Sequence, residues 1–397
     1  MRPIRPVNVL FAVAILLPVV AMFAPKGLVI LTLLAAVLVA ARRGAVVFAL
    51  AEVLTPVGLL LALALAWAAA AALFSPDIAE GLTLWLSILV LFGAGFLLLG
   101  AARDMVPAER KTVTAGLMAG GVLFLTLVAF EVATGGILTG SLRDEVEPEL
   151  FNRGASVLAL FMWLFTAAFA ARFGRPWALG FIAASLAALF FLPMAAATLA
   201  AAAGAVVFLA VWTTPHRALG VIAIVSASMI LGAPFISLWL FTPENVTSWL
   251  PDLPGSWQHR LYVWEFASTR ITEAPIFGWG LDASRAIPGG AAQVTNELVL
   301  AAPALPLHPH NVSIQVWLEL GLPGIALFAA GAVAVILSLR SARLTTLSCA
   351  AAAAALVSWL VLAMLSFGIW QNWWLVVPWL FAVLFVAALP ERGGQRS

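Results

Sequence analysis

The sequence contains little cysteine, histidine or charge. Among 397 residues there are one cysteine and four histidines, and 10% of the residues are charged, against about 25% in an average soluble domain. The lone cysteine, Cys349, excludes an intramolecular disulfide. The low charge excludes an ordinary soluble globular domain.

The motifs of nucleotide and metal chemistry are also missing. The sequence has no Walker A motif, no Gly-x-Gly-x-x-Gly in a βαβ unit and no nucleophile elbow. The predicted outer segments hold no carboxylate cluster for a divalent metal, and the acidic stretch 144–149 has no histidine. His308, His310 and Glu319 are zinc-type ligands, but their spacing does not favour a zinc site. We predict no metal and no cofactor, so the energy for a reaction must come from its substrate.

Apolar residues are abundant instead. They make up 64% of the chain, and the mean hydropathy is +1.09. Nearly uncharged runs of about 18 residues or more recur, and each can cross a hydrocarbon core of about 30 Å. Met1–Pro6 carries two arginines, but no cleavage site ends the first apolar run, so we expect no cleavable signal peptide. The composition predicts an all-α polytopic membrane protein whose partner is a lipid bilayer and not a nucleic acid.

The charged breaks divide the chain into about twelve predicted transmembrane helices. Nine lie within residues 1–240, an outer loop or cap covers 241–310, and three more helices and a tail lie within 311–397. The predicted spans are 8–24, 27–41, 46–74, 79–101, 113–134, 155–171, 176–192, 194–212, 218–241, 311–338, 345–367 and 371–389.

The basic residues predict the orientation of these spans. With both termini in the cytoplasm, 14 of the 20 basic residues lie in inner loops or tails. The inner ones are Arg2, Arg5, Arg42, Arg43, Arg103, Arg110, Lys111, Arg172, Arg175, Arg217, Arg340, Arg343, Arg392 and Arg396. The outer ones are Lys26, Arg143, Arg153, Arg260, Arg270 and Arg285.

Two outer segments, 135–153 and 241–310, are long enough to hold a site. In the second, residues 256–274 have helical periodicity, and PIFGWG then predicts a tight turn at Gly278 and Gly280. We expect a helix on the membrane face, the turn, and a loop returning to HPHN. A plain amphipathic surface helix is the alternative.

The tenth span begins with a polar stripe. Asn311, Gln315 and Glu319 follow the two histidines at i, i+4 and i+8, so they share one helix face. A carboxylate is costly against lipid, so this face should point into the bundle or into a wet cavity. Helix capping with hydrogen bonds between helices is an equally good alternative.

Three residues from distant parts of the chain converge at the outer level. The predicted topology places Arg153, Arg260 and His310 there. Two arginines bind phosphate oxygens bidentately, and histidine is a general base near neutral pH. This combination indicates a diphosphate site with a base. The alternative for an arginine at a membrane boundary is that its long side chain only extends its charge into water.

Several stretches carry a family resemblance. They are NRGA at the start of the sixth span, RLYVWEFA, PIFGWGLDASRAIP and HPHNVSIQVWLELGLPG. With the twelve-span plan they resemble the O-antigen ligase family, most specifically over 152–154 and 260–324. Their HN…E-x-G core is shared with O-antigen polymerases, exopolysaccharide polymerases and certain protein O-oligosaccharyltransferases.

The resemblance implies a GT-C-like bundle in the bacterial inner membrane. Such a ligase moves a glycan from undecaprenyl diphosphate to a sugar hydroxyl of lipid A–core on the periplasmic face, without metal or nucleotide. Arg153 and Arg260 would hold the diphosphate. His310, the histidine directly before asparagine, would accept the acceptor proton, oriented by Asn311 or Glu319, and the reaction would invert the anomeric carbon.

Further residues are predicted to bind substrate, while the role of His308 stays open. Arg270 is the weaker alternative to Arg285 as an additional basic residue. The predicted set is Arg285, Asn311, Gln315, Glu319, Trp264, Gly278 and Gly280.

Two other functions remain as alternatives. One is a polymerase that joins two polyprenyl-linked glycans, which differs from a ligase in its acceptor. The other is a transporter of polysaccharide or lipid carrier, for which Glu52 and Glu131 would mark an ion pathway. Neither glutamate has a clear partner in the sequence.

Overall fold

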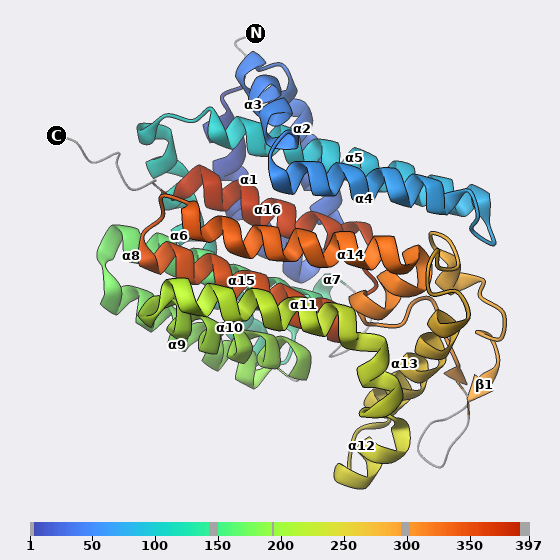
Figure 1. Cartoon of the computed structure of the whole chain (residues 1–397). Coiled ribbons are helices and arrows are strands. Elements are labelled where there is room, and N and C mark those ends of the chain that lie inside the picture. The colour runs from blue at the N-terminus through green and yellow to red at the C-terminus, as the bar shows by residue number, and fades with distance from the viewer. Residues whose placement is uncertain (1–3, 143–149, 193, 295–301, 390–397) are drawn as a thin grey trace.

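The computed structural model describes residues 4–142, 150–192, 194–294 and 302–389 (Figure 1). Arg2, Arg143, the acidic stretch 144–149, Pro193, Arg392 and Arg396 therefore lie outside the described residues. The described chain is almost entirely helical, which confirms the all-α polytopic class.

The helices and strands follow one another in a simple order. The elements are α1 (Pro6–Phe23), α2 (Gly27–Ala40), α3 (Arg43–Val53), α4 (Pro56–Ala72), α5 (Ile78–Arg103), α6 (Pro107–Thr134), α7 (Ile137–Leu142), α8 (Leu150–Phe173), α9 (Arg175–Phe191), α10 (Ala195–Thr213), α11 (Pro215–Trp239), α12 (Pro243–Trp249), α13 (Gly255–Glu273), the 3-10 helix η1 (Ala283–Arg285), β1 (Gln293–Val294), β2 (Ala302–Pro303), α14 (Val312–Ser341), α15 (Thr346–Leu365) and α16 (Asn372–Ala388).

A helix occupies each of the predicted spans. Within the described residues, eight helices are long and apolar enough to cross a membrane: α1, α5, α6, α8, α10, α11, α14 and α15. Helices α2 and α3 pass this test only together, with a bend of 116° between them, and α4, α9 and α16 are shorter apolar helices.

The predicted continuous span 46–74 is wrong. The chain breaks after α3, and α4 begins at Pro56. Thr55 ends one helix and starts the next, because its Oγ1 donates to Glu52 O at 2.7 Å and accepts the Gly58 N–H at 3.1 Å. Proline at the first helical position has no N–H to lose, so Thr55-Pro56 is a strong helix start.

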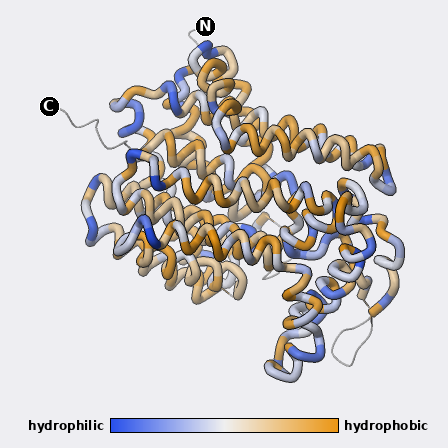
Figure 2. Tube along the Cα trace, in the orientation of Figure 1, coloured by the Kyte–Doolittle hydropathy of each residue, from blue (hydrophilic) through white to orange (hydrophobic). Residues whose placement is uncertain are grey.

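The long helices lie side by side as a bundle (Figure 1). Hydrophobic residues run along their length and hydrophilic ones gather at the connections (Figure 2). Helix α8 forms much of the core, since 89% of the residues in its apolar stretch are buried. Helices α12 and α13 lie beyond one end of the bundle, where α13 packs against α11 and α14.

Helix α13 confirms the helix expected over 256–274. Its buried residues include Leu261, Ala267, Ser268 and Ile271, as the periodicity predicted. The two-residue strands β1 and β2, which pair antiparallel, had no counterpart in the sequence interpretation.

Helix α14 is broken one third of the way along. Gly321 has φ 60° and ψ −161°, and Pro323 lacks the N–H that would continue the helix. The carbonyls left free here find other donors: Trp279 N–H to Leu318 O at 2.8 Å, Gly280 N–H to Glu319 O at 3.0 Å, and the Trp67 indole to Leu320 O at 2.8 Å. The break in α14 is thus the docking point of the outer loop.

The predicted glycine turn makes this docking close. Gly278 and Gly280 have φ of 73° and 99°. A Cβ on Gly278 would lie 2.6 Å from Glu319 O, and one on Gly280 would lie 2.4 Å from the Cα of Ser75. Only glycine combines this backbone conformation with this proximity.

We expect Gly321→Ala to lower the melting temperature of the purified protein. Alanine at φ 60° costs about 1–3 kcal/mol, and its Cβ would lie 2.2 Å from Ile276 O. Gly331→Ala is the matched control, because Gly331 lies in the same helix with nothing within 4 Å of a Cβ, and alanine favours helix. Equal melting temperatures for the two variants would contradict the role given to Gly321.

Candidate active site

The loop before α14 holds His310 in an unusual backbone conformation. Its φ is +54°, in the left-handed region that non-glycine residues rarely adopt. The residues on both sides are fixed. Trp264 donates its indole N–H to Pro309 O at 2.8 Å, and Asn311 caps α14 by accepting two backbone N–H groups of the first turn at 3.0 and 3.2 Å.

The ring of His310 is oriented by Ser366, the residue that follows α15. Its Nδ1 lies 2.8 Å from Ser366 O. A carbonyl oxygen can only accept, so Nδ1 carries the proton, and Nε2 keeps its lone pair. Burial lowers the pKa of His310 and the nearby Arg260 charge lowers it further, while the bond to Ser366 acts in the opposite direction. His310 is therefore a neutral imidazole with a basic Nε2.

The orienting partner expected from the sequence was wrong. The Asn311 side chain caps the helix, and the carboxylate of Glu319 is bound elsewhere. The backbone carbonyl of Ser366 performs this role.

Arg260, on α13, contacts the same end of α15 that binds the ring of His310. Its Nη1 donates to Leu365 O at 2.8 Å, the carbonyl next to the one that binds His310, and the guanidinium lies 4.9 Å from the Trp257 ring centroid. Burial lowers the pKa of Arg260. A partly desolvated guanidinium gains from an anionic partner, and no ion pair of Arg260 is recorded among the described residues.

Arg153 joins this group from α8. Its guanidinium lies 5.6 Å from the ring centroid of Trp373, in the first turn of α16. The Trp373 indole donates to Gln371 Oε1 at 2.8 Å, and Gln371 Nε2 lies 3.1 Å from His308 Nε2. The connection between α15 and α16 thus brings Arg153, Arg260 and His310 to one end of the bundle.

The polar stripe of α14 faces the interior, as predicted. Gln315 and Glu319 are fully buried, and their side chains share a hydrogen bond of 3.0 Å. Glu319 also accepts from Ser284 Oγ at 2.5 Å, from the Trp370 indole at 2.6 Å and from the Asp282 N–H at 2.8 Å. This geometry fits the alternative of capping and interhelical hydrogen bonds, and binding of substrate by these residues stays a prediction.

The remaining basic residues of the outer loop are tied to carboxylates. Arg285 Nε pairs with Asp282 Oδ1 at 3.0 Å, and its side chain is 53% exposed. Arg270 pairs with Glu273 at 2.8 Å. The charge of Arg285 is one of the causes that lower the pKa of His308.

Sequence reasoning missed the segment between α15 and α16. Ser366 and Leu365 act through backbone carbonyls, which leave no signal in a sequence. Gln371 and Trp373 did leave one, since SFGIWQNWW is a polar and aromatic break between two apolar spans.

The glutamates of the transporter alternative have structural partners. Glu52 Oε1 pairs with Arg103 Nε at 2.7 Å. The buried Glu131 accepts the N–H groups of Leu138 and Thr139 at 2.9 and 3.0 Å, which ties α6 to α7. An ion pathway is not needed to account for either residue.

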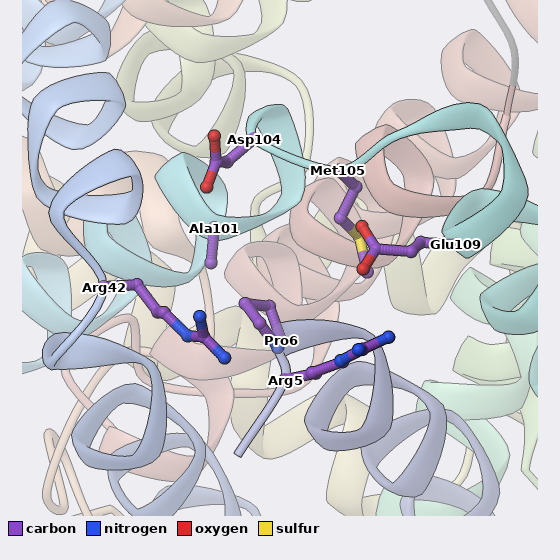
Figure 3. Close-up of a pocket in the computed structure, with 7 residues that line it drawn as sticks. All are labelled: Arg5, Pro6, Arg42, Ala101, Asp104, Met105 and Glu109. Carbon is purple, nitrogen blue, oxygen red and sulfur yellow. The ribbon is translucent and has the colours of Figure 1, made fainter. Parts of the chain in front are cut away.

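A cavity lies at the other end of the bundle. Arg5, Arg42, Asp104 and Glu109 line it together with Pro6, Ala101 and Met105 (Figure 3). Arg5 precedes α1, whereas Gly154, next to Arg153, packs against Met22 near the end of that helix. The cavity is therefore separate from the cluster of His310, Arg260 and Arg153.

Comparison with known proteins shows which family this chain resembles. A family described as O-Antigen ligase matches residues 180–329, which include Arg260 and His310 but not Arg153. Two proteins named "Putative polysaccharide ligase", from Rickettsia conorii and Rickettsia felis, are each 24% identical over 330 residues, or 82% of this chain and 78% and 79% of theirs. A Rickettsia prowazekii protein with the same description is 28% identical over 172 residues, 42% of each chain. These matches confirm the resemblance to the O-antigen ligase family.

Proposed function

We propose, from its resemblance to the O-antigen ligase family, that this chain is a polysaccharide ligase of the bacterial inner membrane. It transfers a glycan from undecaprenyl diphosphate to a sugar hydroxyl of lipid A–core on the periplasmic face. The observation that carries this proposal is the convergence of two guanidinium groups and a neutral imidazole at one end of an apolar bundle.

The arginines bind the donor diphosphate. A guanidinium has five N–H donors, and Arg260 has one bond recorded within the described residues. Arg153 lies over the aromatic face of Trp373, and no hydrogen bond of its guanidinium is found within the described residues. Both therefore keep donors for phosphate oxygens and stabilise the charge that develops on the leaving diphosphate.

His310 activates the acceptor. The acceptor oxygen bonds to the anomeric carbon while the bond from that carbon to the diphosphate oxygen breaks. The hydroxyl proton passes to Nε2 of His310, and the electron pair leaves with undecaprenyl diphosphate. Attack opposite the leaving group inverts the anomeric carbon, and no external energy source is required.

The surrounding helices favour lipid-linked substrates. Many large apolar side chains of these helices are exposed, and so are Leu240 and Phe241 between α11 and α12 and Ile276 and Phe277 in the glycine turn. These side chains suit the acyl and polyprenyl chains of the outer leaflet. A donor and an acceptor that both carry lipid can thus reach the site from the membrane.

A reconstituted transfer assay tests this function. Purified protein in liposomes is mixed with undecaprenyl-diphosphate-linked glycan, lipid A–core and a chelator. We expect glycan on lipid A–core and release of undecaprenyl diphosphate in equal amounts. Longer glycans on the polyprenyl carrier would instead identify a polymerase. Absence of any product, with the glycan crossing the bilayer, would favour the transporter.

A further inference from the structure

His308 is a half-buried titratable group that the proposed mechanism does not use. It lies two residues before His310, and the two ring centroids are 4.2 Å apart. A Cβ on Gly368 would lie 2.7 Å from the His308 ring, so the ring fits tightly against the turn between α15 and α16.

Both nitrogens of His308 have a neighbour at hydrogen-bond distance. The His310 backbone N–H donates to Nδ1 at 3.2 Å. The Nε2 atom lies 3.1 Å from the side-chain amide of Gln371, which also binds the Trp373 indole N–H. A neutral imidazole accepts at only one nitrogen, which the bond from His310 assigns to Nδ1, whereas an imidazolium can accept at neither. The bond at Nδ1 therefore favours the neutral ring.

The electrostatic surroundings act in the same direction. Burial, His310, Arg285 and Arg260 together lower the pKa of His308 to about 3. At neutral pH the ring is an acceptor that does not titrate. It is suited to holding another group in place and not to exchanging protons with substrate.

The group that it holds is in a strained conformation. His310 has φ of +54°, and such residues persist only where neighbours determine their backbone. The His308 acceptor binds the N–H of His310 itself, while Trp264 and Asn311 fix the residues on either side. The hydrogen bond from Nδ1 of His310 to Ser366 then sets the direction of Nε2.

We propose that His308 is a positioning residue, which accepts the backbone N–H of His310 and so holds the ring of His310 in its proton-accepting orientation. Gln371 lies 3.1 Å from Nε2 of His308, and through Trp373 it connects the histidine pair to Arg153. This inference rests on the proposed function for its kinetic consequence, and on geometry alone for the orientation of His310.

Three substitutions separate the two contacts of His308. His308→Asn keeps an acceptor near the place of Nδ1, His308→Gln keeps a polar atom near the place of Nε2, and His308→Ala removes both. We expect His308→Ala and His308→Gln to lower kcat by about 10–100-fold, since a displacement of about 1 Å costs up to 10²-fold. The KM for the donor should stay within about twofold, and His308→Asn should recover most of kcat.

A second measurement does not need the transfer reaction. The chain has four histidines, so ¹⁵N-histidine labelling of protein in nanodiscs resolves the protonated nitrogen of His310. We expect Nδ1–H alone in the unmodified protein and in His308→Asn, and a mixture of both forms in His308→Ala.

The outcomes separate this proposal from the proposed function. Unchanged kcat together with an unchanged form of His310 in His308→Ala would overturn the positioning role. Recovery by His308→Gln in place of His308→Asn would also overturn it. If the unmodified protein transfers no glycan, the proposed function fails, and the nitrogen measurement still decides the role of His308.

Discussion

Replacing His310 by asparagine is expected to lower kcat by about 10²–10⁴-fold, the usual contribution of a general base. Asparagine adopts φ of +54° more readily than most other non-glycine residues, so the loop keeps its conformation while the base is lost. Binding of undecaprenyl diphosphate should change by less than about twofold, because His310 acts on the acceptor. Initial rates and calorimetric binding measure the two effects.

The control for this variant is His216→Asn. His216 lies in the first turn of α11, at the other end of the bundle, and only its backbone carbonyl binds Arg340. Its replacement should leave kcat unchanged. Comparable activity of the unmodified and His310→Asn proteins would remove His310 from the mechanism.

The pH dependence of the unmodified protein follows from the same residue. Burial and Arg260 lower the pKa of His310 below its ordinary value of 6.5, so the neutral, basic form persists down to that lower pKa. We expect kcat/KM to be level above pH 6.5 and to fall as the pH decreases below it. A fall with a midpoint above 6.5 would contradict the assignment, and His310→Asn should lose this limb of the profile.

The sequence predicted that the three candidate site residues lie at one end of the bundle, but not which groups hold them in place. Arg153, Arg260 and His310 were placed together because the charged breaks between apolar runs give the number of spans. That number determines which loops lie on the same side of the membrane. Their partners could not be predicted, because Leu365 and Ser366 contribute carbonyl oxygens that every residue possesses.

Polar residues in apolar helices were predicted to face inward, but their partners were not predictable. Glu319 was expected near His310 and instead joins α14 to the 3-10 helix η1 and to Trp370. Four donors from three segments meet this carboxylate. Which segments meet depends on the break in α14, and hence on how the outer loop docks at Gly321.

At the break between α3 and α4, by contrast, the sequence did contain the signal that was missed. Thr55-Pro56 is a helix-start signal that was present in the sequence. The apolar run around it was long enough to hide the signal, since a span of 29 residues still satisfied the length rule for a tilted helix.

Replacing Arg260 by glutamine is expected to lower kcat/KM by about 10²–10³-fold, with donor binding and kcat both reduced. The guanidinium contributes charge in the ground state, and its contribution grows as the diphosphate leaves. Loss of one preorganised donor at a developing charge typically costs about 10²–10³-fold in kcat. Arg153→Gln should weaken donor binding in the same direction, because both side chains lie at the same turn of the chain.

Each of these arginines has a counterpart at the other end of the bundle. Arg340 donates to His216 O at 2.8 Å, as Arg260 does to Leu365 O. Arg175 lies 5.6 Å from the Trp212 ring centroid, as Arg153 does from that of Trp373. If these contacts matter only for the fold, Arg340→Gln and Arg175→Gln should lower activity as much as Arg260→Gln and Arg153→Gln. If the arginines bind the diphosphate, the two control variants keep full activity, and only the variants beside His310 lose transfer. Because each pair shares its structural contact and differs in position, the comparison separates binding of the donor from stabilisation of the bundle.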